Sequence, residues 1–223
     1  MSAQHEIADS NGALVAWSGL VAGQALVNFG GDLFGDVPED RIYRYSNAAL
    51  ALLQFGVILA VVLVIAKRGG PREALALGSP TSWKRAAAIG AFLVVGLMAL
   101  FAVLGPLLQA GDAQKLAPEW DPNRVVPFAI NATVIALVSP VVEELTYRGL
   151  GFTVLRRFGP AYAIVVTGTM FALGHALVAL LPTAAAFGLG LAYLRSRTGS
   201  IHPGIILHVL FNTIGVLAVV LAS

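Results

Sequence analysis

Chemically reactive side chains gather in the second half of the chain, within sequence that is otherwise apolar. They fall in the stretches SPVVEELTYRGL, FALGH and HVLFN and comprise Glu143, Glu144, Arg148, His175, His208 and Asn212. Cysteine is absent, and no serine lies in a G-x-S-x-G setting. A covalent acyl-enzyme is therefore less favoured than hydrolysis by direct attack of water.

Helical spacing gives the two adjacent glutamates different roles. Glu144 and Arg148 are four residues apart, so they lie one turn apart on one face and can form a buried ion pair. Glu143 points about 100° away around the helix and is free to face a polar cavity. Two carboxylates sharing one arginine would leave net negative charge in a low-dielectric site, so we expect Glu143 to act separately.

Histidine and amide side chains supply the other groups that acyl hydrolysis needs. His208 and Asn212 are four residues apart and project toward one locus, and His175 forms a wall from another helix. A carboxylate and one histidine can activate a water, while a second histidine and an amide can donate hydrogen bonds to an oxyanion. Glu143, His175 and His208 would equally suit zinc, although the pattern is not H-E-x-x-H, so both chemistries stay open.

Each residue also has a purely structural interpretation. An ion pair of Glu144 with Arg148 holds a helix in register, and for this pair we favour that role. Asn212 could bond two helices together, and Phe171, four residues before His175, is interpreted as packing. A single neutral histidine bonded to a carbonyl is ordinary in a protein core. Several polar groups without an assigned structural partner, spread over three helices, are harder to explain by packing than any one of them is.

Composition places these residues in a membrane. Of 223 residues, 57% are hydrophobic and only 12% are charged, and the mean hydropathy is +0.81. A chain of this size has too few charged side chains to cover a surface that faces water. We therefore predict an all-α, polytopic transmembrane helix bundle in the lipid bilayer, in which every intramembrane charge costs several kcal/mol and indicates function.

Seven apolar stretches are candidates for transmembrane helices. They are residues 11–30, 46–66, 86–108, 125–147, 161–179, 183–195 and 203–221. The first is weakened by Asn11, Gln24 and Asn28, and the sixth is too short to cross unaided unless it is tilted or packed inside the bundle. We expect residues 1–223 to form one integral membrane domain whose motif-bearing core is about 125–215.

Loop charges set the predicted orientation. The loop 67–85 has five basic residues and one acidic residue, whereas the loops 31–45 and 109–124 are richer in acidic residues. The positive-inside rule then places the N-terminus, 67–85, Arg156–Arg157 and Arg195–Arg197 on the cytoplasmic side. The basic pI follows from these loops, so we expect no nucleic-acid partner. The stretch 71–82 is predicted to be a surface element at this face.

Depth along the helices presents a geometric problem. A helix rises about 1.5 Å per residue, and His208 is only six residues from the cytoplasmic edge at His202. Glu143 and His175 are more residues away from that edge, so straight helices would not bring the three side chains to the same depth. We therefore predict that Pro140 breaks or kinks the fourth helix, or that residues 196–206 dip below the membrane surface.

Taken in order, the three motifs resemble those of the CPBP family of intramembrane proteases. E-E-x-x-x-R is Glu143, Glu144 and Arg148; F-x-x-x-H is Phe171 and His175; H-x-x-x-N is His208 and Asn212. The family comprises type II CAAX prenyl endopeptidases and bacteriocin-processing proteins, and the resemblance covers roughly residues 125–215.

The resemblance implies a hydrolase that cuts a membrane-associated protein or peptide, with a prenylated CAAX peptide as one candidate substrate. It implies that Glu143 and His175 activate water and that His208 and Asn212 form the oxyanion site. Glu144 and Arg148 would support the site. The family has been described both as metalloproteases and as glutamate-dependent proteases without metal, and we favour the latter, with the active site toward the cytoplasmic half.

Two other classes of function fit an intramembrane polar cluster. A transporter or channel could use Glu143 and the histidines to relay protons or bind an ion. Against it, no inverted repeat is visible and the polar groups lie only in the last four predicted spans. A scaffold that binds a membrane partner would need no hydrolysis. The substitution Glu143→Gln separates these alternatives from the protease.

Overall fold

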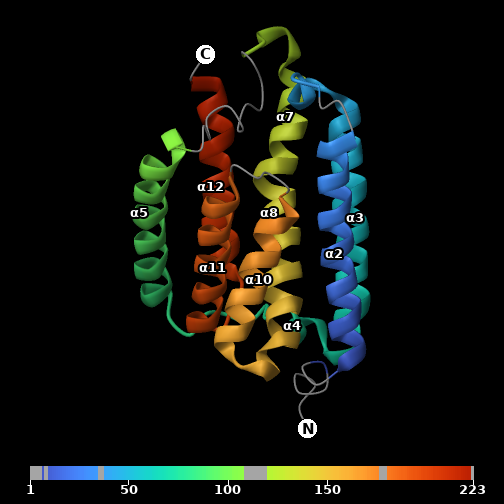
Figure 1. Cartoon of the computed structure of the whole chain (residues 1–223), viewed down its shortest axis with the longest axis vertical. Coiled ribbons are helices and arrows are strands. Elements are labelled where there is room, and N and C mark those ends of the chain that lie inside the picture. The colour runs from blue at the N-terminus through green and yellow to red at the C-terminus, as the bar shows by residue number, and fades with distance from the viewer. Residues whose placement is uncertain (1–6, 8–9, 35–37, 108–119, 176–179, 222–223) are drawn as a thin grey trace.

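Long helices account for nearly all of the computed structural model, which describes residues 7, 10–34, 38–107, 120–175 and 180–221. No strand occurs in these ranges. Five long α-helices are α2 (Asn11–Phe34), α3 (Tyr45–Ala66), α5 (Trp83–Leu107), α11 (Leu181–Thr198) and α12 (His202–Leu221), and α10 (Pro160–Gly174) is shorter. Figure 1 shows them running up and down side by side, with the start of α2 and the end of α12 at opposite ends of the bundle.

A composite fourth helix completes the bundle. It comprises η3 (Pro122–Arg124), α7 (Val125–Thr133), η4 (Val134–Val138), α8 (Ser139–Glu143), η5 (Glu144–Gly151), α9 (Phe152–Leu155) and η6 (Arg156–Phe158). The η4 and η5 stretches are π-helical, and η3 and η6 are 3₁₀ turns. Further short elements are η1 (Arg41–Tyr43), η2 (Lys67–Gly69) and α4 (Pro71–Ala74).

The helical membrane bundle predicted from composition is confirmed. Four helices in the described residues are long and apolar enough to cross a membrane: Asn11–Gly30, Tyr45–Gly69, Trp83–Gly105 and Pro122–Phe158. Large apolar side chains point outward from them, and Phe92 is 77% exposed, as a lipid-facing surface requires. Two shorter apolar helices are Pro160–Gly174 and His202–Ala218. The count of seven spans and the single-domain assignment stay predictions.

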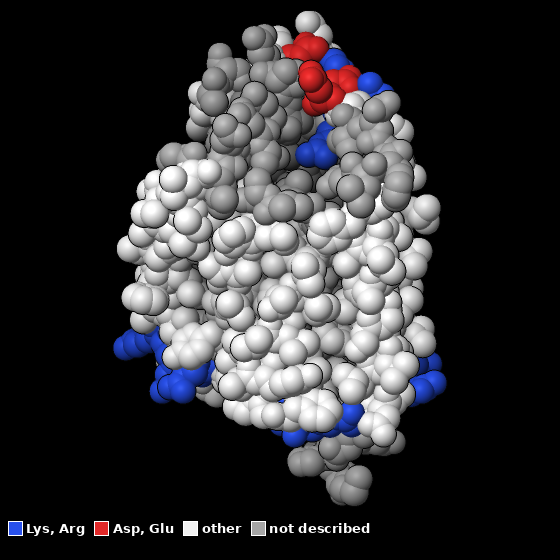
Figure 2. Space-filling view, viewed as in Figure 1, with Lys and Arg blue, Asp and Glu red and all other residues white. Residues whose placement is uncertain are grey.

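Charged side chains lie at the two ends of the bundle. On the face shown in Figure 2, acidic side chains occupy one end together with basic ones, and the opposite end carries Lys and Arg. At the acidic end, Asp40 accepts hydrogen bonds from Arg124 at 2.9 Å and from Arg44 at 2.6 Å. These bonds hold the pKa of Asp40 below its ordinary value and tie α3 to α7. The charge distribution supports the predicted orientation, which stays a prediction.

The segment between α3 and α5 is more than the surface element that we expected. Ala74, Leu75 and Ala76 are buried, and the Leu75 backbone lies so close to Gly149 of η5 that a Cβ there would be 3.1 Å from the Leu75 carbonyl oxygen. The carbonyl of Ala76 also accepts a hydrogen bond from the Ile201 N–H. Pro71, Arg72 and Glu73 are exposed, as a surface element requires, but the sequence of so short a segment did not indicate that its apolar residues would pack under the fourth helix.

Two structural features lie at the places where we predicted a change of depth. The fourth helix changes its winding on either side of Pro140, at η4 and at η5, and it continues without a break. In the turn between α11 and α12, Thr198, Ser200 and Ile201 are fully buried, and backbone hydrogen bonds join Thr198 and Ile201 to the segment that precedes α5. The predicted depth of these segments in the membrane stays a prediction.

Helices α10 and α11 approach each other backbone to backbone at two glycines. A Cβ at Gly168 would lie 2.8 Å from the Leu189 nitrogen, and one at Gly188 would lie 2.6 Å from the Gly168 carbonyl oxygen. Small residues permit such close packing in lipid, where dispersion contacts replace the hydrophobic effect.

We expect Gly168→Ala to lower the free energy of unfolding by about 1–3 kcal/mol, because backbone atoms cannot move aside as a flexible side chain would. The matched control is Gly215→Ala on α12, where a Cβ meets nothing within 4 Å. That variant should be neutral or slightly stabilising. Denaturant unfolding in detergent measures both, and equal stabilities would contradict the close approach.

Candidate active site

Glu143 and Glu144 lie at the junction of α8 and η5, inside the bundle. Glu143 is 8% exposed and Glu144 is fully buried. The predicted ion pair is present, with Arg148 Nη1 at 2.8 Å from Glu144 Oε1. Arg148 also donates to the Gly188 carbonyl, and its guanidinium lies 4.3 Å from the centre of the Phe171 ring. Arg148 and Glu144 are therefore fixed by contacts on several sides.

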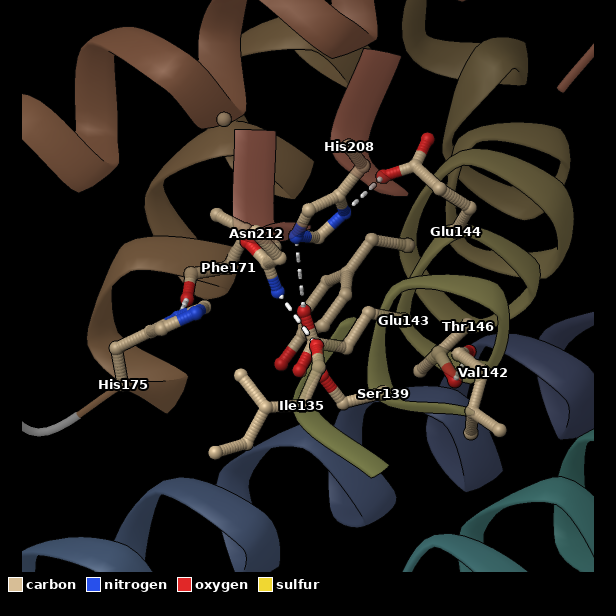
Figure 3. Close-up of polar contacts among 12 residues, drawn as sticks. Ile135, Ser139, Val142, Glu143, Glu144, Thr146, Phe171, His175, His208 and Asn212 are labelled. Carbon is tan, nitrogen blue, oxygen red and sulfur yellow. Dashed lines mark hydrogen bonds and ion pairs between the residues drawn. The ribbon is translucent and has the colours of Figure 1, made fainter. Parts of the chain in front are cut away.

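His208 from α12 lies between the two glutamates (Figure 3). Its Nδ1 is 3.3 Å from Glu144 Oε1 and its Nε2 is 3.6 Å from Glu143 Oε2. The edges of Phe171 and Phe187 enclose the ring, with centroid distances of 5.5 and 5.1 Å. Phe171 therefore packs against both Arg148 and His208, which agrees with the packing role expected for it.

Asn212 lies one turn beyond His208 and is attached to the fourth helix. Its Nδ2 donates to the Ile135 carbonyl oxygen over 2.9 Å, and Ser139 Oγ donates to the same oxygen over 3.3 Å. Ile135 belongs to the π-helical η4, where the altered winding frees carbonyls for side-chain donors. An amide nitrogen carries two hydrogens, so the second N–H of Asn212 is left for another acceptor.

His175 lies at the end of α10, with its ring centre 4.5 Å from that of Phe171. Its Nδ1 is 2.8 Å from the Phe171 carbonyl oxygen, and its side chain is exposed. A carbonyl only accepts, so Nδ1 carries the proton and, in the neutral ring, Nε2 has a free lone pair. Among the described residues, His175 makes no hydrogen bond or ion pair with Glu143 or His208. In Figure 3 its ring points toward the site from the α10 side.

Among the described residues, side chains from other helices donate to three carbonyls of the fourth helix. Besides the Asn212 bond to Ile135, Trp17 Nε1 donates to the Thr146 carbonyl over 2.9 Å and Arg195 Nε donates to the Arg148 carbonyl over 3.1 Å. Arg195, which the topology placed at the cytoplasmic edge, is only 4% exposed.

Sequence reasoning missed the supporting residues of the first two helices. Asn28 was counted only as a weakness of the first span, yet its amide donates to the carbonyl of Gly174, next to His175. Gln54 on α3 donates in turn to Asn28. Polar residues inside apolar spans were the available signal, since lipid tolerates them only when they are paired.

The expected zinc ligands are not gathered around one point. Within the described residues, no group of three His, Asp or Glu side chains is arranged so that it could hold a metal ion. Both nitrogens of His208 face carboxylates, and His175 is bonded to its own helix. The side chains as arranged therefore do not fit a zinc site, and the chemistry below passes through none.

Comparisons with known proteins identify the same region. Residues 125–214 match the model of the family described as "Type II CAAX prenyl endopeptidase Rce1-like". A Bacillus subtilis (strain 168) protein described as "Putative membrane peptidase YdiL" is 27% identical over 212 residues, which cover 90% of this chain and 82% of that protein. No solved structure matches the chain. Every residue of the three motifs lies within the matched range.

Proposed function

We propose that this chain is an intramembrane endopeptidase that hydrolyses a peptide bond of a membrane-associated protein or peptide, since residues 125–214 match the model of the Rce1-like, type II CAAX prenyl endopeptidase family. The observation that carries the proposal is the placement of Glu143. Its Oε2 is buried without a hydrogen-bond partner in the described structure, 3.6 Å from His208 Nε2. A buried carboxylate oxygen left free beside an imidazole is available to a reacting water.

The proposed mechanism has a proton on both ring nitrogens of His208, and the buried charges then balance. With both glutamates ionised, Arg148 and a doubly protonated His208 would bring the net charge of the four groups to zero. A neutral set costs far less in a low-dielectric interior than an unbalanced one. Glu144, already bound to Arg148, orients His208 through Nδ1, and His208 Nε2–H is thereby directed toward the reacting side.

The proposed reaction assigns one step to each group. Glu143 takes a proton from water as the water oxygen attacks the peptide carbonyl carbon, and His175 Nε2 accepts the second water hydrogen in a hydrogen bond that orients the nucleophile. His208 Nε2–H and the second Asn212 N–H donate to the oxyanion. Glu143 then passes its proton to the leaving amine as the carbon–nitrogen bond breaks.

The site lies in the half of the bundle nearer its basic end. His208 is six residues from the first residue of α12, a rise of about 9 Å out of some 30 Å of hydrocarbon. By the positive-inside rule this is the cytoplasmic half. A substrate anchored in the membrane, including one carrying a prenyl group, would therefore present its scissile bond near the cytoplasmic surface.

The direct test is cleavage of membrane-tethered reporter peptides, prenylated and unprenylated, by the purified protein in lipid vesicles. We expect cleavage of at least one reporter, and mass spectrometry of the products locates the cut bond. Failure to cut any reporter of either kind, by protein shown to be folded, would count against the protease.

A chelator tests the choice of mechanism in the same assay. We expect a strong chelator to leave the rate unchanged, because the proposed water is activated by Glu143 and His175 alone. Loss of activity on chelation, with recovery on adding zinc, would overturn the metal-free mechanism while leaving the protease intact.

A further inference from the structure

A pair of amide side chains from the first two helices connects to the end of α10 that carries His175. Gln54 Nε2 on α3 donates to Asn28 Oδ1 over 3.1 Å, and Asn28 Nδ2 on α2 donates to the carbonyl oxygen of Gly174. Gly174 is the last residue of α10, and His175 follows it directly. Both amides lie outside residues 125–214, the range that the family model matches.

Helix α10 needs a donor at this end because it stops inside the bundle. Its 15 residues give a length of about 22 Å, less than the roughly 30 Å of a hydrocarbon core. Figure 1 shows it ending well below the upper end of α12. The last carbonyls of a helix lack partners within it, and lipid supplies none. The carbonyl of Phe171 is bonded by the His175 ring and that of Gly174 by Asn28.

Gln54 determines which way the Asn28 amide faces. Because Asn28 Oδ1 accepts from Gln54, its Nδ2 is left to point at Gly174. The Gly174 carbonyl shares one rigid peptide plane with the His175 nitrogen. A bond that fixes this plane therefore fixes the backbone from which the His175 side chain departs.

The hydroxyl of Tyr147 also lies close to Gly174. A Cβ at Gly174 would lie 2.7 Å from the Tyr147 hydroxyl, so glycine allows this approach. The hydroxyl is itself 3.3 Å from Gln24 Oε1 on α2, one turn before Asn28. Helix α2 thus contacts the α10 terminus directly through Asn28 and indirectly through Gln24 and Tyr147.

We propose that Asn28, oriented by Gln54, is a positioning residue for His175: it holds the end of α10 so that the His175 ring stays directed at the water bound by Glu143. This inference rests on the proposed function, since it assumes the role of His175 in activating water. It gives the first two helices a part in catalysis through hydrogen bonds to the matched domain.

Kinetics of Asn28→Leu tests the proposal. We expect kcat to fall about 10- to 100-fold with little change in KM, because a displacement of about 1 Å in a catalytic group costs that much while substrate contacts remain. Gln54→Leu should act in the same direction with a smaller effect. Asn47→Leu is the control, because Asn47 makes an amide contact of the same kind with Asn131, remote from His175, and should leave kcat unchanged.

A double-variant cycle separates positioning from general support of the fold. In a His175→Gln background, Asn28→Leu should cause no further loss of kcat, because the group it positions is gone. An equal loss in both backgrounds would overturn the proposal and indicate that Asn28 supports the bundle as a whole.

A measurement without substrate keeps the proposal testable if no reporter is cleaved. Nitrogen-15 NMR of histidine-labelled protein reports which ring nitrogen carries the proton. Asn28→Leu should shift the His175 signals and leave those of His208 in place, whereas unchanged His175 signals would overturn the link. Absence of cleavage by the wild type would count against the protease alone, since the NMR comparison does not depend on it.

Discussion

Replacing Glu143 with glutamine should lower the rate of reporter cleavage by about 10²- to 10⁴-fold, the usual contribution of a general base. Glutamine has the shape of glutamate but cannot take a proton from water. The protein should still fold, at some loss of stability: Glu143 Oε2 makes no hydrogen bond in the described structure that the substitution could break, but the buried charges are no longer balanced. The rate constant at saturating substrate measures the effect, and a thermal unfolding curve in the same lipid measures the fold.

Glu73→Gln provides the matched control for this variant. Glu73 lies on α4 at the same basic end of the bundle, and its side chain is exposed. The control removes the same charge near the same membrane surface and should cleave at the wild-type rate. If Glu143→Gln kept more than about a tenth of the wild-type rate, Glu143 could not be the base, and the role would have to pass to a histidine.

The sequence alone was sufficient to identify the ion pair and the helices that bring the site together. Membrane segments contain few charged residues, so the spacing of four residues between Glu144 and Arg148 predicted an ion pair. The structure contains this pair. His208, from the third motif, also contacts Glu143 and Glu144 from the first motif.

Other parts of the site depend on tertiary structure that a periodic pattern does not reveal. The π-helical winding of η4 and η5 departs from 3.6 residues per turn, so faces assigned from an ideal α-helix shift within this segment. It is His208, and not His175, that contacts Glu143 in the described structure. The burial of Leu75 under η5 depends likewise on contacts between distant segments.

Removal of the Arg148 side chain should destabilise the protein severely. We expect Arg148→Met to lower the free energy of unfolding by about 3–5 kcal/mol, because it leaves Glu144 charged, buried and without its partner. The same substitution would remove the hydrogen-bond donor of the Gly188 carbonyl and the cation that lies over the Phe171 ring. Unfolding by a denaturing detergent in mixed micelles is a suitable measurement, with Gly215→Ala as the reference for an ordinary helix substitution.

The double variant Glu144→Leu with Arg148→Met distinguishes the structural role of the pair from its role in orienting His208. Removing both charges replaces a buried ion pair by apolar side chains of similar size, which is often neutral for stability, so most of the loss should be recovered. Cleavage should nevertheless stay low, because His208 Nδ1 would have lost the carboxylate that orients it. A double variant that recovered full cleavage along with stability would show that Glu144 and Arg148 serve the fold alone, and that the orientation of His208 comes from the aromatic rings that enclose it.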